Sequence, residues 1–222
     1  MTVTIGIDIG QKVDPTAIAV LEKVKRADGE HYIARFLQRL PLATTYPAIA
    51  ERLGQIVRGV HVITSNTPAG NPRITTFADA TGVGAPVVDL LRLDGVKVVA
   101  CYFTHGDRRT EERVNGQEQV SIGKAWLVSR LQALLQTNRL HLPQTAEAAL
   151  LAQELLDYEI KVSEDANDRY GAFRVGSHDD LVTALGLAAQ GEKRRGGGSG
   201  SWLPSPDDDE RGPFPDRDPW RL

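Results

Sequence analysis

Two adjacent carboxylates begin an apolar segment near the carboxyl end of the chain. Asp179 and Asp180 follow His178 and precede LVTALGLAA, which is typical of a buried helix. Helix capping explains such residues, because Ser177 and Asp180 have the Ser-x-x-acid spacing and acids stabilise the positive end of a helix. Metal binding is the alternative, since divalent cations such as Mg²⁺ prefer oxygen ligands. The helix start alone leaves both interpretations open.

Two further acids lie in apolar, Gly-flanked segments. Asp8 falls within TVTIGIDIG (2–10), and Asp79 falls within ITTFADAT (74–81) before a Gly-rich turn. An unpaired charge in such a strand is costly to desolvate. A buried basic partner for Asp8 and turn initiation by Asp79 explain each acid singly, whereas bound cations explain them together. Carboxylates on two strands and one helix can hold two ions about 3.5–4 Å apart, an arrangement that hydrolyses phosphodiesters.

The segments that must position these acids begin with three strands. We expect the strands over residues 2–10, 16–24 and 30–40, with a turn at Asp28-Gly29 between the second and third. A helix over 46–59 follows, because apolar residues recur there at helical spacing. This order predicts an antiparallel start to the sheet.

The middle of the chain is typical of a parallel crossover. A strand over 74–81, a helix over 85–93 and a strand over 96–104 follow one another. After a charged loop we expect two helices, a short hairpin and a last helix, over residues 123–140, 145–158, 159–163 with 171–175, and from 178 onward. Together these elements predict an α/β domain with a mixed sheet over residues 1–190.

Composition narrows the class of protein. The 222 residues are 41% hydrophobic and 25% charged, with one cysteine, Cys101, which we expect in the core. Neither a membrane span nor a secretory leader is visible in the sequence, so we expect a cytoplasmic protein. Residues 191–222 are rich in Gly, Pro and charge, which predicts a disordered tail. Aromatic residues in this tail are candidates for docking on a partner: Trp202, Phe214 and Trp220.

The net charge of −3 does not favour general attraction to a polyanion. A nucleic-acid partner therefore needs bound cations or a local basic patch. Arg108, Arg109 and Arg113 in GDRRTEER form the best such patch, although a solvated charged loop explains them as well.

Three motifs resemble, in this order, the nuclease domain of phage large terminase subunits, which belong to the ribonuclease H-like superfamily. They are IGIDIGQKVDPTAIAV, FADATGVGAPVVDLL and HDDLVTALGLA. Between the second and third, VSIGKAWLVSRLQALLQTNRLHLP is similar to that family's Lys-then-Leu helix. The resemblance covers residues 2–190 and implies a ribonuclease H-like mixed β-sheet flanked by helices.

The resemblance also implies roles for particular residues. Asp8, Asp79 and Asp180 would bind two Mg²⁺ or Mn²⁺ ions, with Asp179 as an auxiliary catalytic residue; the sequence does not decide between 179 and 180. His178 would either contact one of the metal-binding side chains without binding the metal itself, or be a surface residue. Four basic side chains would contact the phosphates of double-stranded DNA: Arg108, Arg109, Arg113 and Lys124. For Lys124, an exposed lysine on a helix is the simpler explanation.

The sequence departs from the family pattern in one respect, the ATPase motor. Large terminase subunits carry an ATPase, but no G-x-x-x-x-G-K-[ST] motif occurs in this sequence. The chain is therefore expected to be an excised domain, a homologue without a motor, or one half of a split machine. A separate ATPase motor or portal protein is a candidate partner. The alternatives are a Holliday-junction resolvase, a sugar-kinase or actin-like phosphotransferase suggested by GIDIG, and a scaffold that has lost the metal.

Overall fold

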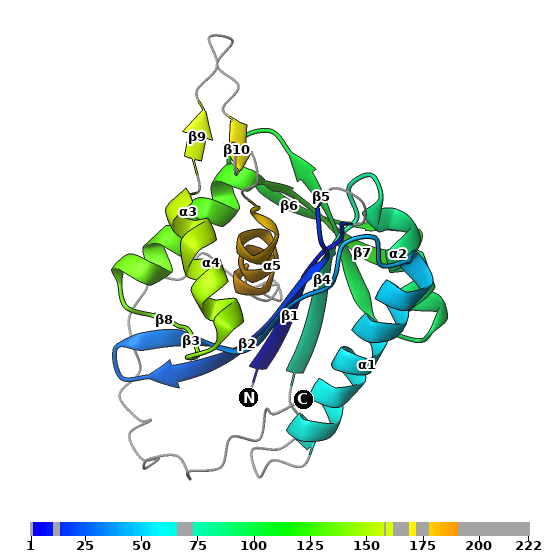
Figure 1. Cartoon of the computed structure of the whole chain (residues 1–222), viewed down its shortest axis with the longest axis horizontal. Coiled ribbons are helices and arrows are strands. Elements are labelled where there is room, and N and C mark those ends of the chain that lie inside the picture. Colours follow the sequence, from blue (N-terminus) through cyan, green and yellow to red (C-terminus); the bar gives the residue numbers. More distant parts are fainter. Residues whose placement is uncertain are drawn as a thin grey trace.

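The computed structural model describes residues 2–10, 14–65, 73–157, 159–161, 169–171 and 178–190. Its centre is an eight-stranded mixed sheet in the order β6-β7-β5-β4-β1-β2-β3-β8 (Figure 1). The strands of this sheet are β1 (Thr2–Asp8), β2 (Ala17–Arg26), β3 (Gly29–Arg39), β4 (Arg73–Asp79), β5 (Val98–Thr104), β6 (Arg109–Val114), β7 (Gln117–Gly123) and β8 (Leu140–His141).

Helices cover both faces of the sheet. They are α1 (Tyr46–Ser65), α2 (Gly84–Leu93), α3 (Lys124–Gln136), α4 (Ala146–Asp157) and α5 (Asp180–Ala189). Figure 1 shows α1 and α2 on one side of the sheet and α3, α4 and α5 on the other. Because both faces are covered, the central strand β1 is buried on both sides, and this explains its nearly continuous apolar sequence.

The predicted strand order of the amino-terminal half is confirmed. β1 and β2 pair antiparallel, as do β2 and β3, and Gly29 has a φ of 129° at the turn between the latter two. β4 pairs parallel to β1 and β5 pairs parallel to β4, with α2 as the crossover. The first helix continues to Ser65, beyond its expected end at residue 59. Cys101 is buried, as expected, and burial raises the pKa of its thiol to about 12.

The expected charged loop after β5 is wrong. Residues 109–114 form β6, which pairs antiparallel with β7 across a tight turn at Asn115 and Gly116. These two residues have φ values of 49° and 78°, as a two-residue turn that matches strand twist requires. The following helix accordingly spans Lys124–Gln136 instead of 123–140, and Leu140 already belongs to β8.

The last elements of the chain are a short hairpin and the helix α5, which packs on the second face of the sheet. β9 (Glu159–Lys161) and β10 (Arg169–Gly171) form the predicted hairpin, with the second strand earlier than expected; residues 172–175 lie outside the described part of the chain. All ten residues of α5 are buried. The predicted tail, residues 191–222, also lies outside the described part. Among the described helices, none has the length and apolar character to cross a membrane.

Candidate metal centre

Asp8 and Asp79 lie next to each other at the carboxyl ends of neighbouring parallel strands. Asp8 is the last residue of β1 and Asp79 the last residue of β4, and the preceding pair, Ile7 and Ala78, is in register. Both aspartates are partly accessible. The carboxyl ends of parallel strands are a common place for ligand sites in α/β sheets.

Small residues let α5 lie directly against β1. A Cβ atom built on Gly6 would lie 2.0 Å from the carbonyl oxygen of Ala184, so only glycine permits this approach. Two residues earlier on the strand, the Thr4 hydroxyl donates a 2.7 Å hydrogen bond to the carbonyl of Ala188. The helix runs antiparallel to the strand, and its first residue, Asp180, therefore lies towards the end of the sheet that carries Asp8.

The charges of the four acids act on one another. Burial raises the pKa of Asp8 well above its usual value, and the neighbouring carboxylates of Asp79, Asp179 and Asp180 raise it further. The positive charge of Lys124 lowers the pKa of Asp8. The structure thus brings together the four acids singled out in the sequence.

Asp79 and Asp180 have raised pKa values as well. Burial raises the pKa of Asp79, although its Oδ1 accepts a 2.8 Å hydrogen bond from the backbone N–H of Thr81, which opposes the shift. Burial also raises the pKa of Asp180, opposed mainly by a hydrogen bond from Arg39. Each carboxylate would be more stable beside a cation than in this site without one.

Only one of the two carboxylate oxygens of Asp180 has a hydrogen-bond partner within the described structure. Its Oδ2 accepts a 2.6 Å hydrogen bond from Nε of Arg39, whereas its Oδ1 is buried and has no hydrogen-bond partner within the described structure. The side chain is only 2% exposed. A buried carboxylate oxygen without a hydrogen bond is costly, and this one is suited to contact a cation.

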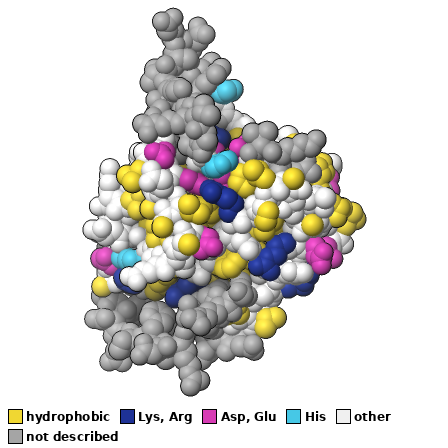
Figure 2. All heavy atoms as spheres, in the orientation of Figure 1, with side chains coloured by type: hydrophobic (Ala, Val, Ile, Leu, Met, Phe, Trp, Pro, Cys, Tyr) yellow, Lys and Arg dark blue, Asp and Glu magenta, His cyan; other side chains and the backbone are white. Residues whose placement is uncertain are grey.

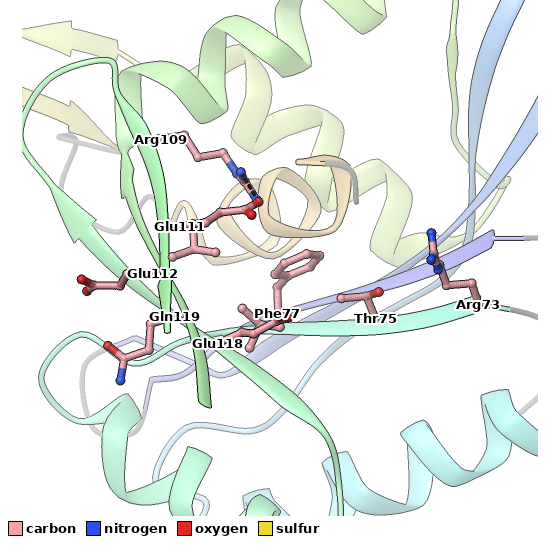
Figure 3. A pocket seen from close by; sticks show the side chains of 10 residues that line it. Arg73, Thr75, Phe77, Arg109, Glu111, Glu112, Glu118 and Gln119 are labelled. Carbon is pink, nitrogen blue, oxygen red and sulfur yellow. Dashed lines mark hydrogen bonds and ion pairs between the residues drawn. The ribbon is translucent and has the colours of Figure 1, made fainter. Parts of the chain in front are cut away.

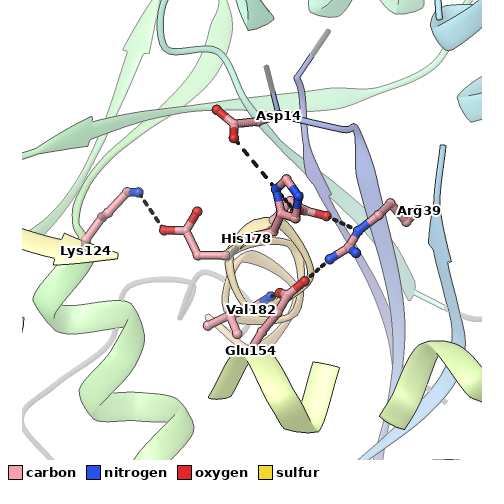
Figure 4. Close-up of polar contacts among 8 residues, drawn as sticks. Asp14, Arg39, Lys124, Glu154, His178 and Val182 are labelled. Carbon is pink, nitrogen blue, oxygen red and sulfur yellow. Dashed lines mark hydrogen bonds and ion pairs between the residues drawn. The ribbon is translucent and has the colours of Figure 1, made fainter. Parts of the chain in front are cut away.

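His178 lies beside this oxygen but does not satisfy it. Its Nδ1 is 3.8 Å from Oδ1 of Asp180 and 4.0 Å from Oδ1 of the exposed Asp14 (Figure 4). Nδ1 of His178 is itself buried without a hydrogen-bond partner in the described structure. The histidine is thus a neighbour of the acids, as one of the two sequence interpretations requires.

Asp179 and Lys124 form a polar pair at the edge of the site. Lys124 Nζ, labelled in Figure 4, lies 3.4 Å from Oδ2 of Asp179. It also lies 5.5 Å from the ring centroid of Phe103. The lysine is therefore part of the acidic site and not an isolated exposed residue of its helix. Asp179 has this cationic partner, whereas Oδ1 of Asp180 has no hydrogen-bond partner among the described residues, which favours Asp180 as the ligand of the two.

The acids are chemically suited to bind a cation, but their side chains are not arranged as a complete coordination site. Among the described residues, no group of three or more His, Cys, Asp and Glu side chains is already arranged to hold a metal ion. The raised pKa of Asp8 and the free oxygen of Asp180 nevertheless fit a divalent cation, whose ligands are carboxylate oxygens. Like charges repel one another, so a bound cation would stabilise these neighbouring carboxylates.

The three arginines do not share one loop. Arg109 lies on β6, where it donates hydrogen bonds to Gln190 (2.9 Å) and Glu111 (2.6 Å) and stacks over Trp126, so it anchors the hairpin. Arg113, also on β6, is exposed and lies 3.6 Å from a carboxylate oxygen of Glu118. Arg108 is exposed immediately before this strand. In Figure 2 the basic side chains of the visible face are scattered among acidic and apolar ones.

A cavity of about 190 Å³ opens on the sheet face that carries α5, away from the acids. Its lining includes Phe77, Arg109 and Glu111 (Figure 3), together with Val120. It also contains Arg73, the first residue of β4, whereas Asp79 is the last residue of that strand. The cavity is therefore distinct from the carboxylate site.

Comparison with known proteins places the fold. No family model and no curated protein matches the sequence. The architecture is that of ribonuclease H-like nuclease domains. Among solved structures, the chain is similar to the large terminase nuclease of the thermophilic phage G20c, with a TM-score of 0.55 and 19% identity over 84% of this chain and 80% of that one.

Two other viral structures agree. The human cytomegalovirus terminase nuclease domain, soaked with Mn and with an inhibitor bound, gives a TM-score of 0.53 and 15% identity over 84% of this chain and 80% of that one. The large terminase nuclease domain of bacteriophage SPP1 with bound Mn gives a TM-score of 0.51 and 12% identity, with 85% of each chain covered. The fold inferred from the three sequence motifs is therefore confirmed.

Proposed function

We propose that this protein is a metal-dependent endonuclease that cleaves DNA with two bound divalent ions. The observation that carries the proposal is the convergence of Asp8, Asp79 and Asp180 at one end of a ribonuclease H-like sheet, with one buried oxygen of Asp180 unpartnered. Similar terminase nuclease structures with bound magnesium or Mn support the choice of Mg²⁺ or Mn²⁺.

Asp8, Asp79 and Asp180 would together hold the two ions, and Asp8 is the acid on which the charges of the others act. When bound, the ions supply a hydroxide for attack on the phosphodiester and stabilise the leaving oxygen. Asp179 would be an auxiliary ligand or would orient another group; its contact with Lys124 holds that ammonium beside the place where a phosphate would lie.

Basic groups near the site would position double-stranded DNA through its phosphates. Arg108 and Arg113 are exposed and suited to this contact, Lys124 lies at the site, and Arg109 would act by fixing the hairpin. We further propose a role in viral DNA packaging, in the host cytoplasm, with a separate ATPase motor or portal protein. In this proposal residues 1–190 form the nuclease domain and residues 191–222 a disordered tail.

The test is cleavage of supercoiled plasmid in the presence of Mn²⁺ or Mg²⁺. The intact protein should nick and linearise plasmid only with metal, and Asp8→Asn should remove the activity. Asp14→Asn is a useful comparison, because Asp14 is exposed and its carboxylate lies 4.0 Å from Nδ1 of His178, a neighbour of the proposed ligands. Metal-independent products, or equal activity of Asp8→Asn, would contradict the proposal. A marked preference for four-way junctions would favour the resolvase, and phosphoryl transfer from ATP to a small hydroxyl compound would favour the kinase.

A further inference from the structure

Asp180 belongs to a buried chain of charges that reaches two other elements. Arg39, at the end of β3, donates through Nε to Asp180 and through Nη2 to Oε1 of Glu154 on α4 (Figure 4). The other oxygen of Glu154 accepts a 3.1 Å hydrogen bond from the backbone N–H of Val182. The Arg39 and Glu154 side chains are 22% and 7% exposed. We refer to Arg39 and Glu154 together as the clamp.

The clamp leaves negative charge at the site. One guanidinium faces two carboxylates, so Arg39 does not neutralise Asp180 alone but shares its positive charge with Glu154. The planar guanidinium engages the two acids from different nitrogens in a fixed geometry, which lysine does not reproduce. Asp180 thus retains anionic character on Oδ1, the oxygen that Arg39 does not touch.

The clamp also fixes the start of α5. The first N–H groups of a helix have no partner within the helix, and Glu154 satisfies that of Val182, two residues after Asp180. The same glutamate therefore holds both the arginine that grips Asp180 and the helix turn that carries it. Rotation of α5 about its axis would break both contacts at once.

We infer that Arg39 and Glu154 are positioning residues that turn Oδ1 of Asp180 towards a divalent cation. This inference rests on the proposed function. The competing possibility is that Arg39 merely neutralises a buried acid. That possibility leaves the unpartnered Oδ1 of Asp180 unexplained.

The experiment compares Mn²⁺ binding by calorimetry in the intact chain and in the variants Arg39→Lys and Glu154→Gln. Loss of groups that hold a metal ligand typically lowers metal affinity about 10–100-fold, and we expect a decrease in this range for both variants. Arg35→Lys is the matched control, because Arg35 lies on the same strand and forms a similar ion pair with Glu22. Its affinity for Mn²⁺ should remain within about twofold of that of the intact chain.

A second readout separates positioning from folding. Melting temperatures without metal show whether each variant folds, and the rise in melting temperature on adding Mn²⁺ reports binding without any need for cleavage. If both single variants are unfolded, the double variant Arg39→Met with Glu154→Leu removes the two charges together, a change that buried ion pairs often tolerate. The folded double variant should also bind Mn²⁺ more weakly.

The outcomes are distinct. An intact chain that binds no Mn²⁺ overturns the proposed function itself. An intact chain that binds Mn²⁺, with unchanged affinity in folded clamp variants, overturns only the clamp. Tighter binding in Arg39→Lys overturns it as well, because it would show that the arginine competes with the cation.

Discussion

Gly6 on β1 and Ala184 on α5 are in backbone contact, and a Cβ on the glycine would lie 2.0 Å from the alanine carbonyl oxygen. We therefore expect Gly6→Ala to push α5 off the sheet. Overpacking of this kind costs about 1–3 kcal/mol of unfolding free energy. Chemical denaturation should show this loss, and Mn²⁺ binding should weaken because Asp180 moves with the helix.

Gly54→Ala provides the contrast for that measurement. Gly54 is buried inside α1, where the nearest atoms to an added Cβ are the ends of the Arg58 and Asp94 side chains, which can shift. Alanine is favoured over glycine in a helix by about 1 kcal/mol, so this variant should be as stable as the parent or more so. Equal losses in both variants would show that close packing of α5 on β1 is not the cause.

Asp8→Asn should stabilise the metal-free protein. Burial and the neighbouring acids raise the pKa of Asp8, so the folded state holds its proton more tightly than the unfolded state. The contribution of Asp8 to stability is therefore full below its usual pKa of 3.8 and is lost as the pH rises through the raised value. At neutral pH we expect the variant to gain on the order of 1 kcal/mol, and thermal melting without metal measures this.

The same variant should fail to respond to Mn²⁺. The parent should melt at a higher temperature with the ion, whereas Asp8→Asn should melt at one temperature with and without it. A metal-free melting temperature below that of the parent would contradict the argument, because it would show that the carboxylate is already compensated by protein groups.

The pairing of β3 with β8 should weaken in mild acid. Nδ1 of His31 lies 2.8 Å from Nε2 of His141, and Nε2 of His31 lies 2.8 Å from a carboxylate oxygen of Asp28. Burial, with the charges of Arg26 and His31, lowers the pKa of His141 below its usual 6.5. The folded state therefore binds this proton less readily, and the contribution of His141 to stability is full above that value and declines as the pH falls.

Imidazole titration by NMR should give a depressed pKa for His141. Asp28→Asn should depress it further, because the carboxylate of Asp28 favours the charged ring. His141→Gln should reduce the loss of stability between about pH 7.5 and about pH 5.5. A pKa at or above the usual value for His141 would contradict the described environment.

Cys101 should not react with thiol reagents in the native state. Its pKa of about 12 leaves almost no thiolate near neutrality, and its thiol receives a 3.5 Å hydrogen bond from Gln190. A thiol reagent at about pH 8 should modify the protein only after denaturant is added. Rapid modification of the native protein would show that the end of α5 opens readily.

The elements with a clear apolar period were predictable, and β6 was not. Four of its six residues are charged and four are exposed, as is typical of an edge strand, so its sequence resembles a loop. The turn dipeptide Asn115-Gly116 was the available signal, since this pair strongly favours hairpins. Apolar Val120 and Ile122 on β7, both buried, were included instead in the approach to the next helix.

The candidate ligands could be found from sequence because acids are conspicuous in apolar strands, as at Asp8 and Asp79. Arg39 and Glu154 were missed, since their partners are far apart in the chain: Arg39 and Asp180 are separated by 141 residues. Glu154 offered a weak signal, because it lies three residues after the buried Leu151 on the inward face of α4. Such a charge needs a partner, but the sequence alone does not say which one.

The complete burial of α5 has a consequence for the newly synthesised chain. The helix that carries Asp180 fits between β1 and α3 only after the strands before it have been made and paired. A chain still emerging from the ribosome therefore has its aspartates apart, and they meet only when the core is finished. Any hydrolytic capacity of this cluster would thus arise with the mature fold, and a truncated product would be inert.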